Sequence, residues 1–334
     1  MRWRHLLTIG LGVGLAATVA VAQVTNDART CARERQNHDL AIEACSHVIA
    51  SDRAGSPAFL GEPFQSRGNA WFRKGDLDRA IADYDEALRL NPDDIAAHIY
   101  RGNAWSRKGD NDRAFADYSK AVRLDPGYAI AYYNRGSAWR AKGDSERAIA
   151  DYDEAIRLDP RIAEAFNNRG NAWSDKGDPE HAIADYSEAI RLNPSFAAAY
   201  YNRGLAWFGK GDFDRAIADY DEAIRRDPHR ANAYDNRGLA WHRKGDLERA
   251  IADYDETIRL DSGDVAAHVY RGNAWYQKRD FDRAIADYDE AIRLDPRYAN
   301  AYFNRGLAWR AKGDHDRADA DFSEATRLDP ALRR

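Results

Sequence analysis

The chain has 334 residues, of which 44% are hydrophobic and 31% are charged, and its formal net charge is −5 at pH 7. This composition excludes the intrinsically disordered class, and the interleaved charges of both signs lack the basic footprint of a nucleic-acid-binding protein. We therefore expect an ordered protein with no nucleic-acid partner.

The first 22 residues differ from the rest of the chain. A short basic start, MRWRH, precedes the uncharged apolar run LLTIGLGVGLAATVA, and Ala20-Val21-Ala22 forms a small-x-small site before Gln23. This order is typical of a cleaved secretory signal peptide, and the apolar run is short for a membrane-spanning helix. We expect residues 1–22 to be removed. The mature protein is then predicted to be periplasmic or secreted, with no stable membrane anchor.

Residues 23–60 contain the only two cysteines of the sequence, Cys31 and Cys45. Secretion permits a disulfide between them, whereas a metal site would need a second ligand pair at a metal-like spacing. We predict the disulfide, which would close a loop of about 15 residues and contribute about 3 kcal/mol. It would staple a degenerate capping hairpin over residues 27–50, and the following SDRAGSPAFLGEP is predicted to be a connector.

Glycines then recur every 34 residues until the chain ends. They are Gly68, Gly102, Gly136, Gly170, Gly204, Gly238, Gly272 and Gly306. A fixed period of this length predicts a repeat architecture, with eight units over residues 61–332 and a tail at 333–334.

The second unit shows the pattern within one period. The segment AAHIYRGNAWSRK spaces small and aromatic residues three and four apart, which predicts a helix with one apolar face. Gly109 suits the left-handed turn that ends this helix, and Asp110 can cap a second helix, RAFADYSKAVRL, that stops before Pro126. In the fourth unit, Pro179 falls at a first-turn position that helices tolerate. Each unit is therefore a predicted helix hairpin, and neighbouring hairpins must stack to bury their apolar faces.

This pattern resembles the tetratricopeptide repeat (TPR) family, whose motif is a Gly, an aromatic residue three later, then Ala, an aromatic residue, Ala and Pro. In the second unit these positions are Gly102, Trp105, Ala114, Tyr118, Ala121 and Pro126. The resemblance implies an all-α fold, a right-handed α-solenoid of stacked antiparallel helix pairs with eight TPR units behind the capping hairpin. Arg279 replaces a turn glycine, Ser262 a terminal proline and Arg226 a leucine, which leaves the local geometry near repeats six and seven open.

Several further positions repeat in every unit. The tryptophan at the Trp105 position is predicted to be a core residue. An arginine precedes each marker glycine and an aspartate follows it in the second helix, as Arg67 and Asp83 do. We hypothesise an ion pair at the edge of the core, with two separate solvated charges as the alternative. The recurring DYDEA segment is predicted to be a solvated charged face.

The last unit departs from the others where a following repeat would pack. It has Asp319 and Thr326 where the other units have larger apolar side chains. This substitution predicts a polar end to the stack.

No catalytic constellation stands out, so we expect a protein that is not an enzyme and that holds no cofactor and no metal. The TPR resemblance implies a concave groove, lined by the first helices, that binds a peptide or a partner helix. The positions carried over from the family are Asn69, Arg73, Asn103, Arg107, Asn171, Tyr201, Leu205, Phe208, Asn273, Phe303, Leu307 and Arg310.

The leading hypothesis is a periplasmic scaffold or adaptor whose groove binds a protein partner. Asparagines could hydrogen-bond an extended peptide there, and aromatic residues could anchor it. The alternative is a binder of carbohydrate or cell-wall polymer that uses groove aromatics as stacking platforms. An enzyme regulated by the repeats, or built on them, is a more distant third.

Overall fold

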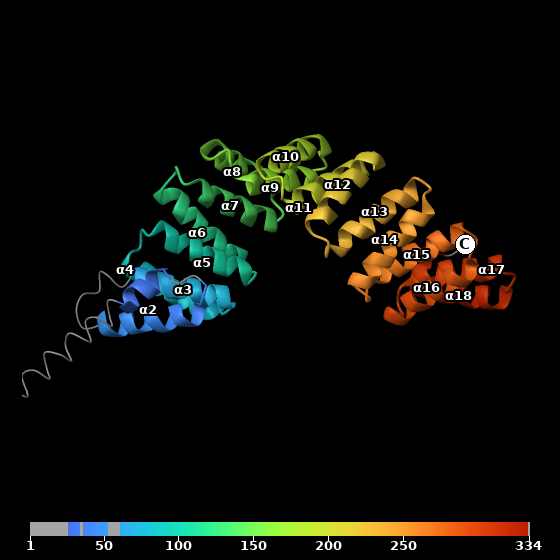
Figure 1. The fold of residues 1–334 in the computed structure, drawn as a ribbon, viewed down its shortest axis with the longest axis horizontal. Helices are drawn as coiled ribbons and strands as arrows, with labels where there is room; N and C mark the ends of the chain where they lie inside the picture. Colours follow the sequence, from blue (N-terminus) through green and yellow to red (C-terminus); the bar gives the residue numbers. More distant parts are fainter. Residues whose placement is uncertain (1–25, 34–35, 53–60, 333–334) are drawn as a thin grey trace, which may run out of the picture. The chain divides into compact units, whose positions relative to one another are not determined.

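A computed structural model describes residues 26–33, 36–52 and 61–332 (Figure 1). These residues are helical apart from short turns, and no strand occurs among them. The predicted signal peptide, most of the predicted connector and the tail at 333–334 lie outside the described residues. None of the described helices has the length and hydropathy that a membrane span requires.

Residues 26–33 are helical and precede α2 (His38–Asp52). A disulfide joins Cys31 to Cys45, with an S–S distance of 2.11 Å, and both residues are buried. Cys45 lies one turn after the buried Ala41, and α2 packs against the first repeat. The structure thus contains the predicted stapled hairpin. The predicted connector is too long, because Pro63 lies inside the next helix.

The first helices of repeats one to eight will be called A helices. They are α3 (Gly61–Lys74), α5 (Ile95–Arg107), α7 (Ala129–Ala141), α9 (Ala163–Asp175), α11 (Ala197–Gly209), α13 (Ala231–Arg243), α15 (Val265–Gln277) and α17 (Ala299–Ala311). The second helices will be called B helices. They are α4 (Leu77–Leu90), α6 (Asn111–Leu124), α8 (Ser145–Leu158), α10 (Pro179–Leu192), α12 (Phe213–Arg226), α14 (Leu247–Leu260), α16 (Phe281–Leu294) and α18 (His315–Leu328). A 3₁₀ turn, η2 (Pro330–Leu332), follows α18.

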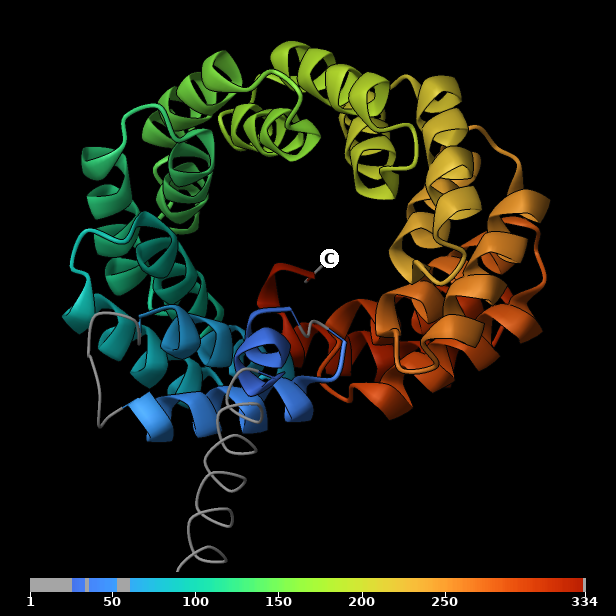
Figure 2. The same cartoon turned by 60° about the vertical axis from the view of Figure 1, so that its left-hand side comes forward.

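The chain divides into two compact units, with the boundary between Arg161 and Ile162. Unit one holds the capping hairpin and repeats one to three, and unit two holds repeats four to eight. Within each unit the A and B helices of a repeat pack as a pair, and the A helices of successive repeats contact one another (Figure 2). The antiparallel stacking predicted from the 34-residue period is confirmed.

The turns within the repeats follow the predicted chemistry. Asp110 caps α6 by accepting a hydrogen bond from the backbone N–H of Arg113, and Pro179 stands in the first turn of α10. Gly109 has a φ of 84°, in the left-handed region that favours glycine. Arg279 takes the same role with a φ of 63°, so the substitution preserves the turn at a cost of about 1 kcal/mol.

The marker glycines allow the two helices of each repeat to approach closely. A Cβ atom at Gly204 would lie 2.7 Å from Cε1 of Tyr220, which is fully buried in the B helix. Such a separation is shorter than a van der Waals contact, so only glycine fits without a shift. The glycine period in the sequence therefore records a glycine-on-tyrosine contact, and in repeat eight Gly306 meets Phe322 instead.

An ion pair joins the two helices of every repeat. In repeat three, Nε and Nη2 of Arg135 donate to the two carboxylate oxygens of Asp151 at 2.8 and 2.6 Å. The equivalent pairs are Arg67–Asp83, Arg101–Asp117, Arg169–Asp185, Arg203–Asp219, Arg237–Asp253, Arg271–Asp287 and Arg305–Asp321. The aspartates are buried and the arginines only partly exposed, so the hypothesised pair is confirmed.

The prediction that DYDEA is a solvated face is wrong for its first aspartate, which is the buried member of this pair. Burial raises the pKa of the Asp83 carboxyl, and the hydrogen bond from Arg67 opposes that shift. The second aspartate is exposed and binds the next repeat, as Asp85 does by accepting from Nη1 of Arg101 at 2.7 Å. Charged groups therefore link helices both within repeats and between them.

The repeated tryptophans are half-buried, so their prediction as core residues is only partly right. Trp105 packs against core clusters, while the guanidinium carbon of Arg113 lies 3.5 Å from its ring centroid. Six other repeats have the same arrangement, and in repeat four His181 stacks on Trp173 instead. A cation from the B helix thus covers one face of each of the seven rings.

Candidate partner-binding face

The predicted site residues lie on the A helices, on a surface that we call the A-helix face. On α11, Tyr201, Leu205 and Phe208 are spaced four and three apart and so share one stripe. Because neighbouring A helices contact one another within a unit, such stripes are adjacent in space. The structure therefore brings the predicted residues of each unit onto one surface. Their binding of a partner remains a prediction.

The four predicted asparagines have partners inside their own repeats. Oδ1 of Asn103 accepts a hydrogen bond from the hydroxyl of the buried Tyr118 at 2.8 Å. The equivalent pairs are Asn69–Tyr84 at 2.8 Å, Asn171–Tyr186 at 2.9 Å and Asn273–Tyr288 at 2.8 Å. Ser137 takes this place in repeat three, 3.1 Å from the hydroxyl of Tyr152. These side chains satisfy a buried phenol, a structural role that the sequence reading missed.

Asparagines also connect successive A helices in unit two. Nδ2 of Asn202 donates to Oδ1 of Asn167 at 3.1 Å and to Oδ1 of Asn171 at 3.0 Å. Nδ2 of Asn304 likewise donates to Oδ1 of Asn273 at 3.0 Å. Hydrogen bonds between asparagine side chains therefore connect the A helices of repeats four and five, and those of repeats seven and eight.

Repeats five and six lack this arrangement. Leu205 and Leu239 stand where repeats one to four and seven have asparagine or serine, and Tyr220 and Tyr254 are fully buried. The hydroxyls of both tyrosines have no hydrogen-bond partner among the described residues. A buried polar group left unpaired costs about 1–3 kcal/mol.

The predicted aromatic residues of unit two are half-buried against their own repeats. The Tyr201 ring centroid lies 6.0 Å from that of Tyr220, and the Phe208 centroid lies 5.3 Å from that of Phe213. Nδ2 of Asn236, on the next A helix, donates to the Tyr201 hydroxyl at 3.1 Å. Leu205 remains 38% exposed between them. The stripe on α11 is thus a fixed apolar surface with one protruding side chain.

The remaining predicted residues lie toward the two ends of the chain. Arg73, Arg107 and Arg310 are exposed, and Arg107 donates to the carbonyl oxygen of Phe72 at 3.1 Å. Phe303 and Leu307 are half-buried on α17. Leu307 occupies the asparagine position opposite Phe322, which has no hydroxyl to satisfy.

A cavity of about 510 Å³ lies beside α17, lined in part by Phe303, Phe322 and Leu332. The predicted polar substitutions are at its rim, where Asp319 is exposed and Thr326 is half-buried. The last repeat therefore ends in a mixed polar and apolar surface.

Asp235 is a residue of the A-helix face that the sequence reading did not single out. It stands on α13 in the stripe that also contains Leu239 and His242, at the position that Tyr201 occupies on α11. Burial raises the pKa of its carboxyl to about 7, and the nearby carboxylate of Asp264 adds to this shift. The signal in the sequence was YDNRG, because an acidic residue replaces the aromatic, amide or aliphatic residue of the other units.

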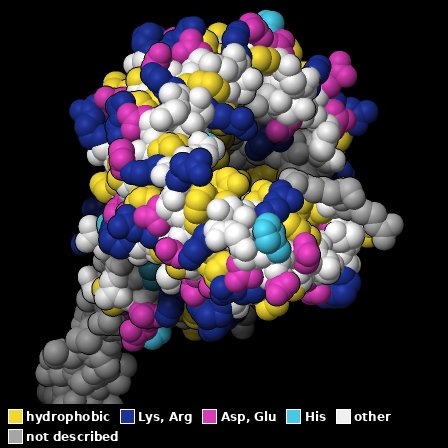
Figure 3. Space-filling model, turned by 90° about the vertical axis from the view of Figure 1, so that its right-hand side faces the viewer, with side chains coloured by type: hydrophobic (Ala, Val, Ile, Leu, Met, Phe, Trp, Pro, Cys, Tyr) yellow, Lys and Arg dark blue, Asp and Glu magenta, His cyan; other side chains and the backbone are white. Residues whose placement is uncertain are grey.

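Charged side chains of both signs intersperse on the face of the molecule drawn in Figure 3. Within the described ranges, no three His, Cys, Asp or Glu side chains are grouped so that they could hold a metal ion. The chemistry available on the A-helix face is therefore that of non-covalent contact, through apolar stripes, amides and single charges.

Solved structures of other repeat proteins resemble this chain. A tetratricopeptide repeat protein from Parabacteroides merdae has 21% identity and a TM-score of 0.54, over 74% of this chain and 98% of that one. PilF of Pseudomonas aeruginosa has 20% identity and a TM-score of 0.54, over 62% and 93%. MamA has 31% identity and a TM-score of 0.45, over 49% and 96%. The first two support the fold, and no curated protein matches the chain.

Family models match most of the repeat array. The model described as tetratricopeptide repeat matches residues 66–129, 101–163, 133–194, 167–231 and 208–265. A TPR repeat model matches residues 272–313, and a further tetratricopeptide repeat model matches residues 299–332. Together with the stacked hairpins, these matches show that the chain belongs to the tetratricopeptide repeat family.

Proposed function

We propose that this protein is a non-catalytic scaffold or adaptor, exported to the bacterial periplasm, that binds a peptide or partner segment on its A-helix face. The tetratricopeptide repeat is generally a protein-interaction fold rather than a catalytic one. Export is supported by the signal-like first 22 residues and by the disulfide, which suits an oxidising compartment.

The observation that carries the proposal is the stripe on α11. Leu205 is exposed between two aromatic residues that are fixed by contacts within the protein. A rigid apolar surface with a protruding aliphatic side chain loses little conformational entropy on binding, which favours a partner segment. The half-buried rings of Tyr201 and Phe208 are packed against their neighbours, which leaves less ring face for the stacking that a sugar polymer would need.

The test is retention of a protein from envelope extract by residues 23–334. We expect wild type to retain a protein that Leu205→Glu loses, because the charge disrupts the centre of the stripe. Since Leu205 is exposed, folding should change by no more than about 0.5 kcal/mol. Leu40→Glu is the matched control, because Leu40 is 43% exposed on α2 and lies outside the A-helix face. Equal retention by Leu205→Glu and wild type would contradict the proposal.

A further inference from the structure

Unpaired buried polar groups of unit two are confined to repeats five to seven. Among the described residues of this unit, the buried side-chain atoms without a hydrogen-bond partner are Tyr220 Oη, Asp235 Oδ1, His242 Nε2, Tyr254 Oη and His268 Nδ1. Asparagine side chains of repeats four and five, and of repeats seven and eight, in contrast, hydrogen-bond to one another. Native proteins leave few buried polar groups unpaired, so several within three successive repeats call for an explanation.

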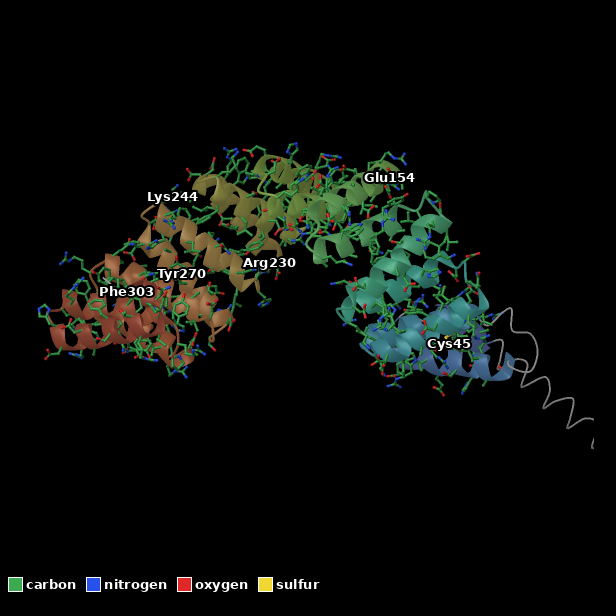
Figure 4. All side chains as sticks on the ribbon, turned by 180° about the vertical axis from the view of Figure 1, so that it is seen from behind. Cys45, Glu154, Arg230, Lys244, Tyr270 and Phe303 are labelled. Atoms are coloured by element: carbon green, nitrogen blue, oxygen red, sulfur yellow. A yellow bond between two sulfur atoms is a disulfide. The ribbon has the colours of Figure 1, made fainter. Side chains whose placement is uncertain are left out.

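Three of the side chains in this region stand on helices that contact one another, α13, α14 and α15, and we call this cluster of side chains the recess. Asp235 comes from α13, Tyr254 from α14, and Tyr270, which is labelled in Figure 4, from α15, the neighbouring A helix. The ring centroids of Tyr254 and Tyr270 are 5.9 Å apart. Burial raises the pKa of both phenols, and the Asp235 carboxylate is the next contributor to each shift, so all three groups are within electrostatic reach.

The recess is rich in hydrogen-bond acceptors and is bordered by a second anion. Asp235 Oδ1 accepts no hydrogen bond from a described residue, and the charged neighbour that acts on this carboxyl is Asp264, the N-cap of α15. The closest cation in sequence, Arg237, is held by Asp253 and Asp221 at 2.6 and 2.5 Å. No ion pair joins Asp235 to a cation among the described residues.

An unpaired carboxylate beside aromatic rings matches the chemistry of a cationic side chain. A guanidinium or an ammonium group donates to the carboxylate and is attracted to the faces of tyrosine rings. We infer that the recess of Asp235, Tyr254 and Tyr270 receives an arginine or lysine side chain of the partner. This inference rests on the proposed function, since the recess lies on the same A-helix face.

The recess also differs from its counterparts in a way that suits a ligand. Where repeats one to four and seven have an asparagine or serine beside the tyrosine hydroxyl, repeat six has Leu239, and the buried hydroxyl of Tyr254 is unpaired. Leu205 does the same for Tyr220, but the residue one turn earlier there is Tyr201, which has no charge. Only repeat six combines the unpaired phenol with a carboxylate.

The test uses fluorescent decapeptide pools of random sequence with arginine, lysine, citrulline or glutamate fixed at the central position, in 150 mM salt. We expect wild type to bind the arginine and lysine pools about tenfold more tightly than the citrulline pool, because citrulline keeps the shape of arginine and loses its charge. Asp235→Asn should bind the four pools alike. Asp214→Asn makes the same change of charge at an exposed carboxylate of α12 and should behave as wild type.

The outcomes separate this inference from the proposed function. If wild type binds the citrulline pool as tightly as the arginine pool, or if Asp235→Asn keeps the preference, the cationic recess is wrong. If the pools bind without preference and Leu205→Glu abolishes that binding, the proposed function still stands. If wild type binds none of the pools, peptide binding by this face fails and the recess fails with it.

Discussion

Repeat four differs from repeats five and six in whether the hydroxyl of the buried B-helix tyrosine has a hydrogen-bond partner. In repeat four, Tyr186 donates to Asn171, which also accepts from Asn202 of the next A helix. In repeats five and six, leucine replaces the asparagine and the hydroxyls of Tyr220 and Tyr254 are unpaired. The comparison teaches that one position of the A helix decides whether a repeat gives its buried tyrosine hydroxyl a partner or leaves it unpaired.

The largest expected effect tests what both kinds of repeat share. Replacing Arg135 by methionine should destabilise the protein by about 3 kcal/mol, because Asp151 is left buried without its partner. Arg135→Ala should cost a similar amount, since the lost charge outweighs the lost stem. Urea denaturation followed by circular dichroism measures both variants. A harmless methionine would show that the arginine acts through its apolar stem.

The next effect concerns Asp235 and pH. Its carboxyl has a pKa of about 7 in the folded protein and an ordinary pKa of 3.8, so between these values the folded state binds more protons than the unfolded state. The stabilisation from protonation is therefore present below about pH 4 and is lost as pH rises through 7. The charged and titratable groups around it are Asp264, Tyr201, Tyr254 and Tyr270.

The measurement for this prediction is the difference in unfolding free energy between Asp235→Asn and wild type at pH 5 and pH 8. Wild type should lose on the order of 2 kcal/mol relative to the variant over that range. Other buried aspartates with raised pKa values, such as Asp83 and Asp253, remain in both proteins, so their contributions cancel in the difference between the two unfolding free energies. Parallel pH curves for the two proteins would show that Asp235 is already neutralised.

Converting repeat four to the leucine type should have the next largest effect. Asn171→Leu removes the acceptor of Tyr186 and one acceptor of Asn202, and we expect a loss of about 1.5 kcal/mol. Thermal unfolding of this variant beside wild type measures the loss. An unchanged melting temperature would mean that water replaces the asparagine at no cost.

The smallest effect distinguishes the two tyrosines directly. Tyr186→Phe should cost about 1 kcal/mol because it removes a hydrogen bond, whereas Tyr220→Phe should stabilise the protein by about 1 kcal/mol because it removes a buried hydroxyl that has no partner among the described residues. Equal losses in the two variants would contradict the comparison.

The sequence predicted the features that depend on spacing. The 34-residue period predicted the hairpins, and the fixed interval between Arg67 and Asp83 predicted their pairing, since both recur in phase. The pairing of Cys31 with Cys45 followed from there being two cysteines. Side-chain packing between helices was harder to predict. The half-burial of Trp105 depends on Arg113 in the B helix, and the spacing of residues within the A helix does not reveal that contact.

The candidate site was predicted less well than the fold. The asparagines were assigned to a ligand because they lie on the groove side, yet Asn103 and its equivalents bind a tyrosine 15 residues further on. That interval was available in the sequence: leucine at 307 coincides with Phe322, which needs no acceptor. Leu205 and Leu239 are exceptions, because each accompanies a tyrosine whose hydroxyl needs an acceptor. These exceptions mark the region that we assign to the partner.

The most direct test of this account is the unfolding free energy of Leu239→Asn compared with wild type. If Tyr254 lacks a partner, the introduced amide should accept its hydroxyl, as Asn273 does for Tyr288, and stabilise the protein by about 1 kcal/mol. A loss of stability, or no change, would contradict the claim that repeat six leaves this buried hydroxyl open.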